Sequence, residues 1–216
     1  MKWRGRLVAW AVLFLLTGAR ANSQDKKDSK TPNYYPLTVG NEWTFQVTAG
    51  GNTAQAVSRI VKMETINEVP LAYLEASVKG KVVATEHLRQ TKEGVFRYRN
   101  NRQEITPPFC LVKYPVKSGS KWSGDIAIGN DKGKYYSEAI EETVEVKAGK
   151  FKAMRVSVKV ESPKQGVVTT TYWFVPDIGF VRQTVDTGRL NVVMELEKFQ
   201  AAKKDEKKDD ETSPER

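Results

Sequence analysis

Residues 153–161, Ala-Met-Arg-Val-Ser-Val-Lys-Val-Glu, decide the fold class of this 216-residue chain. Apolar side chains stand at every second position from Met154 to Val160, with charged or hydroxyl side chains between them. Successive side chains of a β-strand point to opposite faces, so this period of two predicts a strand with one buried and one exposed face. Half-buried strands of this kind are typical of antiparallel sheets.

The same alternation recurs in residues 43–47, 168–174 and 190–196. Turn-forming residues separate the apolar runs, at 49–52, 79–80, 100–101, 129–133, 149, 163–166 and 186–188. Their spacing predicts about ten to twelve strands. The best helical candidate, residues 134–145, also fits a strand. The sequence therefore predicts an all-β fold, an antiparallel meander that forms a curved sheet or an open barrel, with no long helix after the leader.

Two motifs occur twice. The first contains Tyr35, Pro36, Gly40 and Trp43 and recurs with the same internal spacing as Tyr114, Pro115, Gly119 and Trp122. The second, residues 92–97, recurs as residues 177–182. Pro keeps the residue before it extended, and Gly permits a tight turn, so each first motif is expected to place its Trp at the start of a strand and against one end of the core. We predict two related halves, about 34–113 and 114–200.

The ends of the chain differ from its middle. Residues 1–6 are basic, residues 7–16 are apolar, and the Ala19-Arg20-Ala21 sequence predicts a signal peptide of residues 1–21, cleaved between Ala21 and Asn22. A retained membrane anchor is the alternative, but ten residues cover only about half of the hydrocarbon core. No Cys stands near the cleavage site, so a lipid anchor on an N-terminal Cys is not predicted. We expect export to the periplasm or the cell exterior, with no retained transmembrane helix.

Polar segments flank the predicted domain of residues 33–200. Residues 22–32 contain no apolar side chain, and residues 201–216 contain only two alanines in a mixed-sign charged run. Neither segment can bury enough apolar surface to offset the entropy of ordering. The sequence predicts a flexible linker at 22–32 and a disordered, solubilising tail at 201–216.

The charge balance argues against nucleic acid as the partner. The chain has 35 Lys and Arg, 26 Asp and Glu, and a net charge of +9; four of the basic residues and no acid lie in residues 1–21, which leaves +5 for the rest. Basic and aromatic residues interleave only at residues 97–102, which we interpret as a hairpin turn with a solvated rim. An anionic envelope polymer or a lipid headgroup is the weaker alternative for this patch.

Catalytic and metal-binding chemistry finds little support. One Cys and one His exclude an internal disulfide and a Cys/His zinc site, and no cofactor or metal is predicted. His87 is expected on a solvent-facing strand position without catalytic partners, and Cys110 is expected to be a buried, inert thiol. Four acids lie among lysines and predict an exposed, compensated face: Glu138, Glu141, Glu142 and Glu145.

These motifs carry a resemblance. Residues 34–45, residues 143–156 and residues 172–182, the last containing Trp173, Pro176 and Gly179, resemble exported bacterial β-rich domains of unknown function. Such domains are similar in architecture to the open β-barrels of periplasmic lipoprotein carriers, in which a curved antiparallel sheet wraps an apolar concavity. The resemblance implies a fold, and it transfers no catalytic residues.

Two functions remain open at this point. The first is an exported, non-enzymatic binding or envelope-associated module that holds a lipid, a lipidated peptide or a partner protein in its concavity. It depends on the apolar alternation and on aromatics such as Trp43, Trp122, Tyr172 and Trp173, each of which would also serve simply as core. The alternative is a cryptic hydrolase that acts on polysaccharide through two carboxylates.

Overall fold

The computed structural model describes residues 32–164 and 166–203, and within them it contains β-strands and no helix. The strands are β1 Glu42–Ala49, β2 Asn52–Ile66, β3 Val69–Val78, β4 Lys81–Thr91, β5 Gly94–Asn100, β6 Gln103–Lys113, β7 Lys121–Ile128, β8 Asp131–Val146, β9 Gly149–Ser162, β10 Gly166–Val175, β11 Gly179–Asp186 and β12 Asn191–Gln200. The predicted signal peptide, its cleavage site at Ala21 and Asn22, most of the linker and the tail after residue 203 lie outside the described residues. In the described ranges, no helix is long and apolar enough to cross a membrane.

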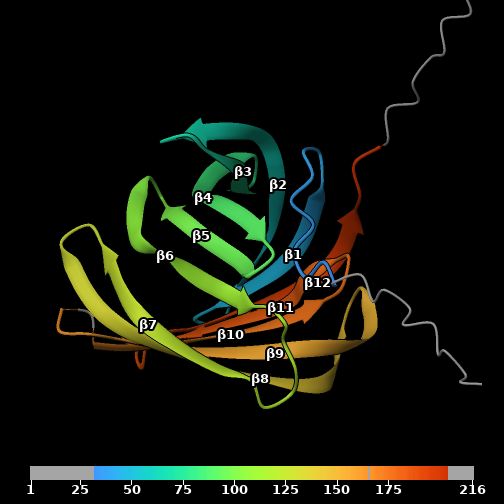
Figure 1. The fold of residues 1–216 in the computed structure, drawn as a ribbon. Coiled ribbons are helices and arrows are strands. Elements are labelled where there is room, and N and C mark those ends of the chain that lie inside the picture. The colour runs from blue at the N-terminus through green and yellow to red at the C-terminus, as the bar shows by residue number, and fades with distance from the viewer. Residues whose placement is uncertain (1–31, 165, 204–216) are drawn as a thin grey trace, which may run out of the picture. The chain divides into compact units, whose positions relative to one another are not determined.

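Each strand pairs antiparallel with the next, which confirms the predicted all-β meander. The sequence predicted a curved sheet or an open barrel, whereas the structure closes because β12 also pairs with β1 (Figure 1). That pairing runs over the whole length of β1 and places Phe45 opposite Leu196 and Val47 opposite Met194. Closure removes the two unpaired edges that an open meander would leave.

The alternation read from residues 153–161 sets the inner face of the barrel. Met154, Val156 and Val158 are buried, whereas Lys159, which follows Val158, is exposed. The same inner face carries the large core side chains of distant strands, such as Phe45 and Phe174. The predicted strand at 190–196 starts one residue late, because the Leu190 carbonyl closes the preceding turn by accepting a hydrogen bond from the Thr187 N–H.

The strand pattern repeats along the chain. β1 and β7 have the same length, and each leads through a short turn into a much longer strand, β2 or β8. The second motif likewise opens β5 at Gly94 and β11 at Gly179. The backbone hydrogen bonds that follow the first motif repeat too: Gly40 N to Ile60 O at 2.8 Å and Gly119 N to Ala139 O at 2.7 Å. These repeats support the proposal of two related halves, which the β1–β12 pairing joins in one barrel.

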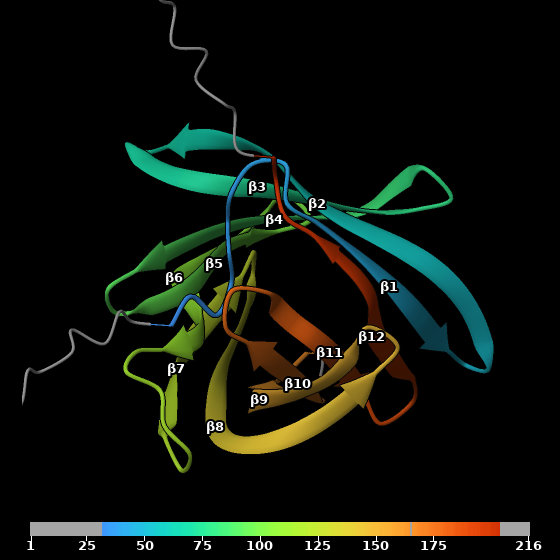
Figure 2. The ribbon, with the colours of Figure 1, turned by 90° about the vertical axis from the view of Figure 1, so that its right-hand side faces the viewer.

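One end of the barrel, here called the plugged end, holds the chain before β1 and the loop between β6 and β7. Figure 2 looks onto this end, where the segment before β1 runs across it. Tyr35 is buried and meets Trp43 edge to face, with ring centroids 5.7 Å apart. The Trp43 indole N–H donates to the Ile178 carbonyl at 2.5 Å, and Gly179 lies directly against both rings. The motifs therefore meet at one place and close this end.

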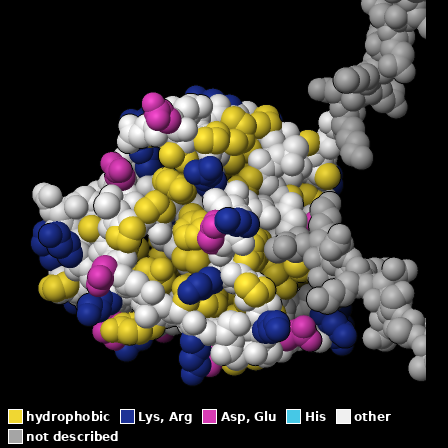
Figure 3. Space-filling view, viewed as in Figure 1, with side chains coloured by type: hydrophobic (Ala, Val, Ile, Leu, Met, Phe, Trp, Pro, Cys, Tyr) yellow, Lys and Arg dark blue, Asp and Glu magenta, His cyan; other side chains and the backbone are white. Residues whose placement is uncertain are grey.

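The barrel wall has one weak seam, between β6 and β7. These strands pair at only two positions, Ile105 with Ile128 and Thr106 with Ala127. Pro107 and Pro108 follow at once in β6, and proline has no N–H to donate to a ladder. Side chains partly replace the missing ladder, since the Trp122 indole N–H donates to the Cys110 carbonyl at 3.1 Å. The seam lies on the face drawn in Figure 3, where apolar side chains gather in the middle of the surface.

Glycine at position 94 is required by space as well as by backbone conformation. Its φ is +151°, and a Cβ there would lie 2.1 Å from the Val112 carbonyl oxygen. Gly80 offers a matched control, because its φ of +73° also disfavours a side chain but no atom lies within 4 Å of a Cβ. We expect Gly80→Ala to lower the free energy of unfolding by about 1 kcal/mol. Gly94→Ala should cost ~3 kcal/mol or more, because backbone must move.

Urea denaturation followed by circular dichroism measures both changes. Equal losses in the two variants would contradict the close approach of β5 and β6 at Gly94.

Candidate functional site

The inner face of the barrel is not equally filled along its length. The end opposite the plugged end, here called the open end, carries the turns that follow β1, β3, β5, β7, β9 and β11. The inward-facing apolar side chains near this end are only half buried: Val47, Ala76, Ala84, Val160, Val168, Val185 and Met194. The lumen is therefore accessible from the open end.

A pocket of about 210 Å³ lies at the open end between the β5–β6, β7–β8 and β9–β10 turns. Its walls are mainly the inward apolar residues Ile126, Ile128, Val160 and Val168. Polar side chains stand at two levels: Thr170 and Asn100 on the inner walls, and Asp131, Lys132 and Ser162 at the turns. The Ser162 hydroxyl lies 2.7 and 2.8 Å from the two Asp131 carboxylate oxygens, which ties the end of β9 to the start of β8.

A charged pair faces inward below this pocket. The Arg97 Nε donates to Glu86 Oε2 at 3.0 Å, and its Nη2 lies 2.9 Å from Glu86 Oε1. The same Nη2 lies 3.5 Å from the hydroxyl oxygen of Tyr172, which comes from β10. The pair adjoins the pocket, because Glu86 stands opposite the pocket residue Asn100 and Tyr172 follows Thr170 on the same face of β10. The lumen thus has apolar walls and a polar floor.

The electrostatics of the floor keep Arg97 charged. Burial acts to lower the pKa of its guanidinium, but the nearby Glu86 carboxylate and the Tyr172 and Tyr35 hydroxyls raise that pKa above its ordinary value. Burial, with a further contribution from Glu86, raises the pKa of Tyr35 well above its usual range, so its phenol stays neutral. The floor therefore holds one positive and one negative charge that balance each other.

The position of Arg97 corrects the interpretation of residues 97–102 as a solvated rim. Asn101 and Arg102 do form the expected turn, with φ values of +48° and +67°. Arg97 instead points into the barrel, where its side chain is only 15% exposed. Irregular pairing on both sides of β5 shifts the strand register, between His87 and Leu88 in β4 and between Arg97 and Arg99 in β5. Arg97 itself follows the buried Val95 by two residues on the same face of β5, so its inward orientation agrees with strand alternation.

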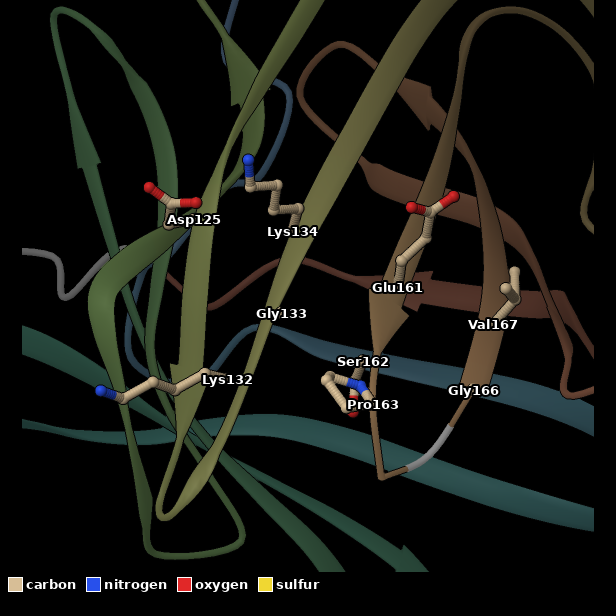
Figure 4. Close-up of a pocket in the computed structure, with 9 residues that line it drawn as sticks. All are labelled: Asp125, Lys132, Gly133, Lys134, Glu161, Ser162, Pro163, Gly166 and Val167. Atoms are coloured by element: carbon tan, nitrogen blue, oxygen red, sulfur yellow. The ribbon is translucent and has the colours of Figure 1, made fainter.

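The outer surface near the open end carries a second hollow, a groove of about 610 Å³ (Figure 4). Two acids line it, Asp125 and Glu161, but Lys134 is the cross-strand partner of both and stands between them. Glu161 is also paired with Lys159 at 2.7 Å. The alternative hydrolase function needs two carboxylates that converge on one substrate bond, whereas Lys134 stands between these two.

The motif residues lie apart from the pocket. Tyr35 and Trp43 are buried at the plugged end, and Gly179 packs against them. Tyr114 and Trp122 are buried beside the β6–β7 seam, where the Tyr34 N–H points to the Tyr114 hydroxyl at 3.3 Å. Four further motif residues shape turns or adjoin them: Pro36, Gly40, Pro115 and Gly119. Pro176 ends β10.

Trp173 and the predicted surface acids Glu138 and Glu142 lie on the outer face. The Trp173 indole N–H donates to Glu142 at 2.6 Å, and the Arg182 guanidinium lies over the Trp173 ring at 5.3 Å. Glu142 also pairs with Arg155, and Glu138 pairs with Lys121 at 3.2 Å, as expected for a compensated face. Glu141 and Glu145 are exposed.

His87 occupies a different environment from the one predicted. It points away from the lumen, as alternation requires, but it is buried rather than solvent-facing, with 6% exposure. Its Nε2 lies 2.6 Å from Glu64, and its ring lies 4.9 Å from the Tyr73 ring, because Tyr73 is its cross-strand neighbour. Within the described residues, no group of three or more His, Cys, Asp or Glu side chains could hold a metal ion.

The fold and the site define a closed antiparallel barrel with one plugged end and a lumen accessible from the other.

No family model matches the chain, and no curated protein matches it. Two solved structures are similar. One is a candidate exported protein with a YmcC-like fold from Bacteroides fragilis, with 15% identity, a TM-score of 0.51, and coverage of 79% of this chain and 100% of that one.

The other is a candidate lipoprotein from Parabacteroides distasonis, with 16% identity, a TM-score of 0.48 and the same coverages. At this level of identity, the likeness to the Bacteroides fragilis protein extends to the fold alone. The particular function must therefore be argued from the residues of this chain.

Cys110 is buried, and burial raises the pKa of its thiol to about 12. In the unfolded chain the same thiol returns to its ordinary value of 9.0, so at pH 8 the folded protein should react about 1000-fold more slowly with a thiolate-specific disulfide reagent. The difference between the two pKa values also makes the free energy of unfolding depend on pH. The stabilisation from keeping the thiol neutral is complete below pH 9 and is lost as the pH rises toward 12.

The measurement compares labelling in buffer and in guanidinium chloride. A Cys110→Ser/Ser123→Cys variant, which moves the thiol to an exposed outer position of β7, should react quickly under both conditions. Rapid labelling of folded wild type would show that the thiol is accessible.

Proposed function

We propose that this protein is an exported, non-enzymatic binding module whose lumen holds a lipid or another hydrophobic ligand with one apolar chain. The observation that carries the proposal is the pocket at the open end, with the inward residues Ile126, Ile128, Val160 and Val168 as its walls. Apolar walls around a few polar groups are typical of small-molecule sites. Burying an apolar chain there removes it from water and is favourable in proportion to its area.

The size of the pocket limits what enters it. Its volume of about 210 Å³ is roughly seven times the ~30 Å³ that a water molecule occupies in the liquid. A single chain of about seven or eight carbon atoms fits that space, whereas a whole phospholipid does not. The rest of a larger ligand would remain outside the barrel, near Asp131 and Lys132 at the mouth.

Export is supported by the leader of residues 1–21, which has the three-part pattern of a signal peptide. The Bacteroides fragilis protein of similar fold is described as exported, which agrees with this address. We place the protein in the periplasm or outside the cell. A binding role is favoured over hydrolysis because Lys134 is the cross-strand partner of both Asp125 and Glu161, and Glu161 is also ion-paired with Lys159.

Adjacent valines on β10 provide a matched test. Val168 points into the pocket, whereas Val167 points outward and is 49% exposed. An indole ring at position 168 would occupy most of the pocket, so Val168→Trp should weaken binding of medium-chain amphiphiles by at least about tenfold, as expected for the loss of most of a chain's apolar burial. Val167→Trp adds the same ring to the outer face and should leave binding unchanged.

Binding of 1-octanol, octanoate and octylammonium to each folded variant can be measured by ligand-observed NMR titration. The proposal fails if none of the three binds to the wild type, or if Val168→Trp binds them as well as Val167→Trp does.

A further inference from the structure

The polar floor of the lumen contains a charged pair whose burial costs free energy and which the packing of the core does not require. Glu86 and Arg97 stand on the inner face among residues such as Leu74 and Leu88, which are buried and apolar. Removing two charges from water is expensive, and apolar residues of similar size in their place are often neutral or stabilising. A role in recognition would account for a charged pair at this depth.

Solvent reaches the pair although it faces inward. The side chain of Glu86 is 21% exposed and that of Arg97 is 15% exposed, whereas Leu88 beside them is fully buried. The accessible side is the one toward the open end, because Asn100 and Thr170 of the pocket adjoin the pair. A ligand that enters the pocket therefore meets this pair first among charged groups below the mouth.

The hydrogen-bonding capacity of the pair is only partly used. A guanidinium has five N–H groups. In Arg97, the groups on Nε and Nη2 are directed to Glu86 and Tyr172, and those on Nη1 make no hydrogen bond to the described part of the chain. The Glu86 carboxylate keeps lone pairs beyond the two that face Arg97. The floor can thus both donate to a ligand and accept from it.

Charge balance then selects the ligand. Arg97 and Glu86 together carry no net charge, so a carboxylate or an ammonium group would bring an uncompensated charge into a region of low dielectric. A hydroxyl or amide group can accept from Arg97 and donate to Glu86 without changing the total charge. Resting on the proposed function, we propose that the lumen receives an uncharged amphiphile with its polar end first, and that its hydroxyl or amide group binds between Arg97 and Glu86.

The first test needs no variant. At neutral pH, 1-octanol should bind to the wild type at least about tenfold more tightly than octanoate or octylammonium, because only the alcohol adds no charge. Binding of all three within twofold, or tighter binding of either ion, would overturn the inference while leaving the proposed function in place. Failure of all three to bind would overturn both.

A second test changes the charge of the floor. Glu86→Gln leaves Arg97 unbalanced, so the preference should shift toward octanoate by about tenfold or more relative to 1-octanol. Glu75→Gln is the matched control, because Glu75 lies one strand away on β3 and points outward. It should leave the order of the three ligands unchanged.

The double variant Glu86→Gln/Arg97→Met restores a neutral floor and should restore the preference for the alcohol. Circular dichroism confirms that each variant folds before it is titrated. If Glu86→Gln is folded and keeps the wild-type order, the polar end of the ligand does not reach the floor and the inference is wrong.

Discussion

The whole barrel depends on the pairing of its first strand with its last. β1 and β12 are joined over the full length of β1, and this pairing converts a meander into a closed wall. Closure gives the two faces of each strand different surroundings, because alternate side chains point into a confined interior and the others point to solvent. The inner face is then filled by Phe45, Leu196 and their neighbours, and the hydrogen bonds of both terminal strands are satisfied without a partner chain.

The two ends of the barrel have opposite properties, and the site follows from that difference. At the plugged end, the segment before β1 adds Tyr35 to the core, and Trp43 reaches the turn after β10 through its indole N–H. The open end has short turns and no such segment, so its inward valines remain half buried. A lumen closed at one end and accessible at the other can hold a ligand in only one place. The charged pair of Glu86 and Arg97 lies where the apolar filling from the plugged end gives way to that space.

Much of this arrangement could be predicted from the sequence, because strands with one buried face leave a period of two. The alternation around Val156 and the turn residues at Asn101 predicted strands and hairpins at the places where they occur. Closure could not be predicted, because it depends on the register between the first and the last strand of the domain. The orientation of Arg97 was also missed, because the basic and aromatic stretch 97–102 was interpreted as a solvated rim although Arg97 shares the face of the buried Val95. His87 was expected in solvent, and only the tertiary structure reveals that Tyr73 and Glu64 surround it.

The seam at Pro107 and Pro108 is the place where the barrel wall opens most easily. Every other junction between the described strands pairs at five or more positions, whereas this one is held by two bridging positions and a few side chains such as Trp122. Local opening follows the line of fewest backbone hydrogen bonds, so fluctuations of the barrel concentrate there. If that line parts, the two six-stranded halves remain attached through β12 and β1 on the other side. The two halves would then separate along the seam and pivot about the β1–β12 junction.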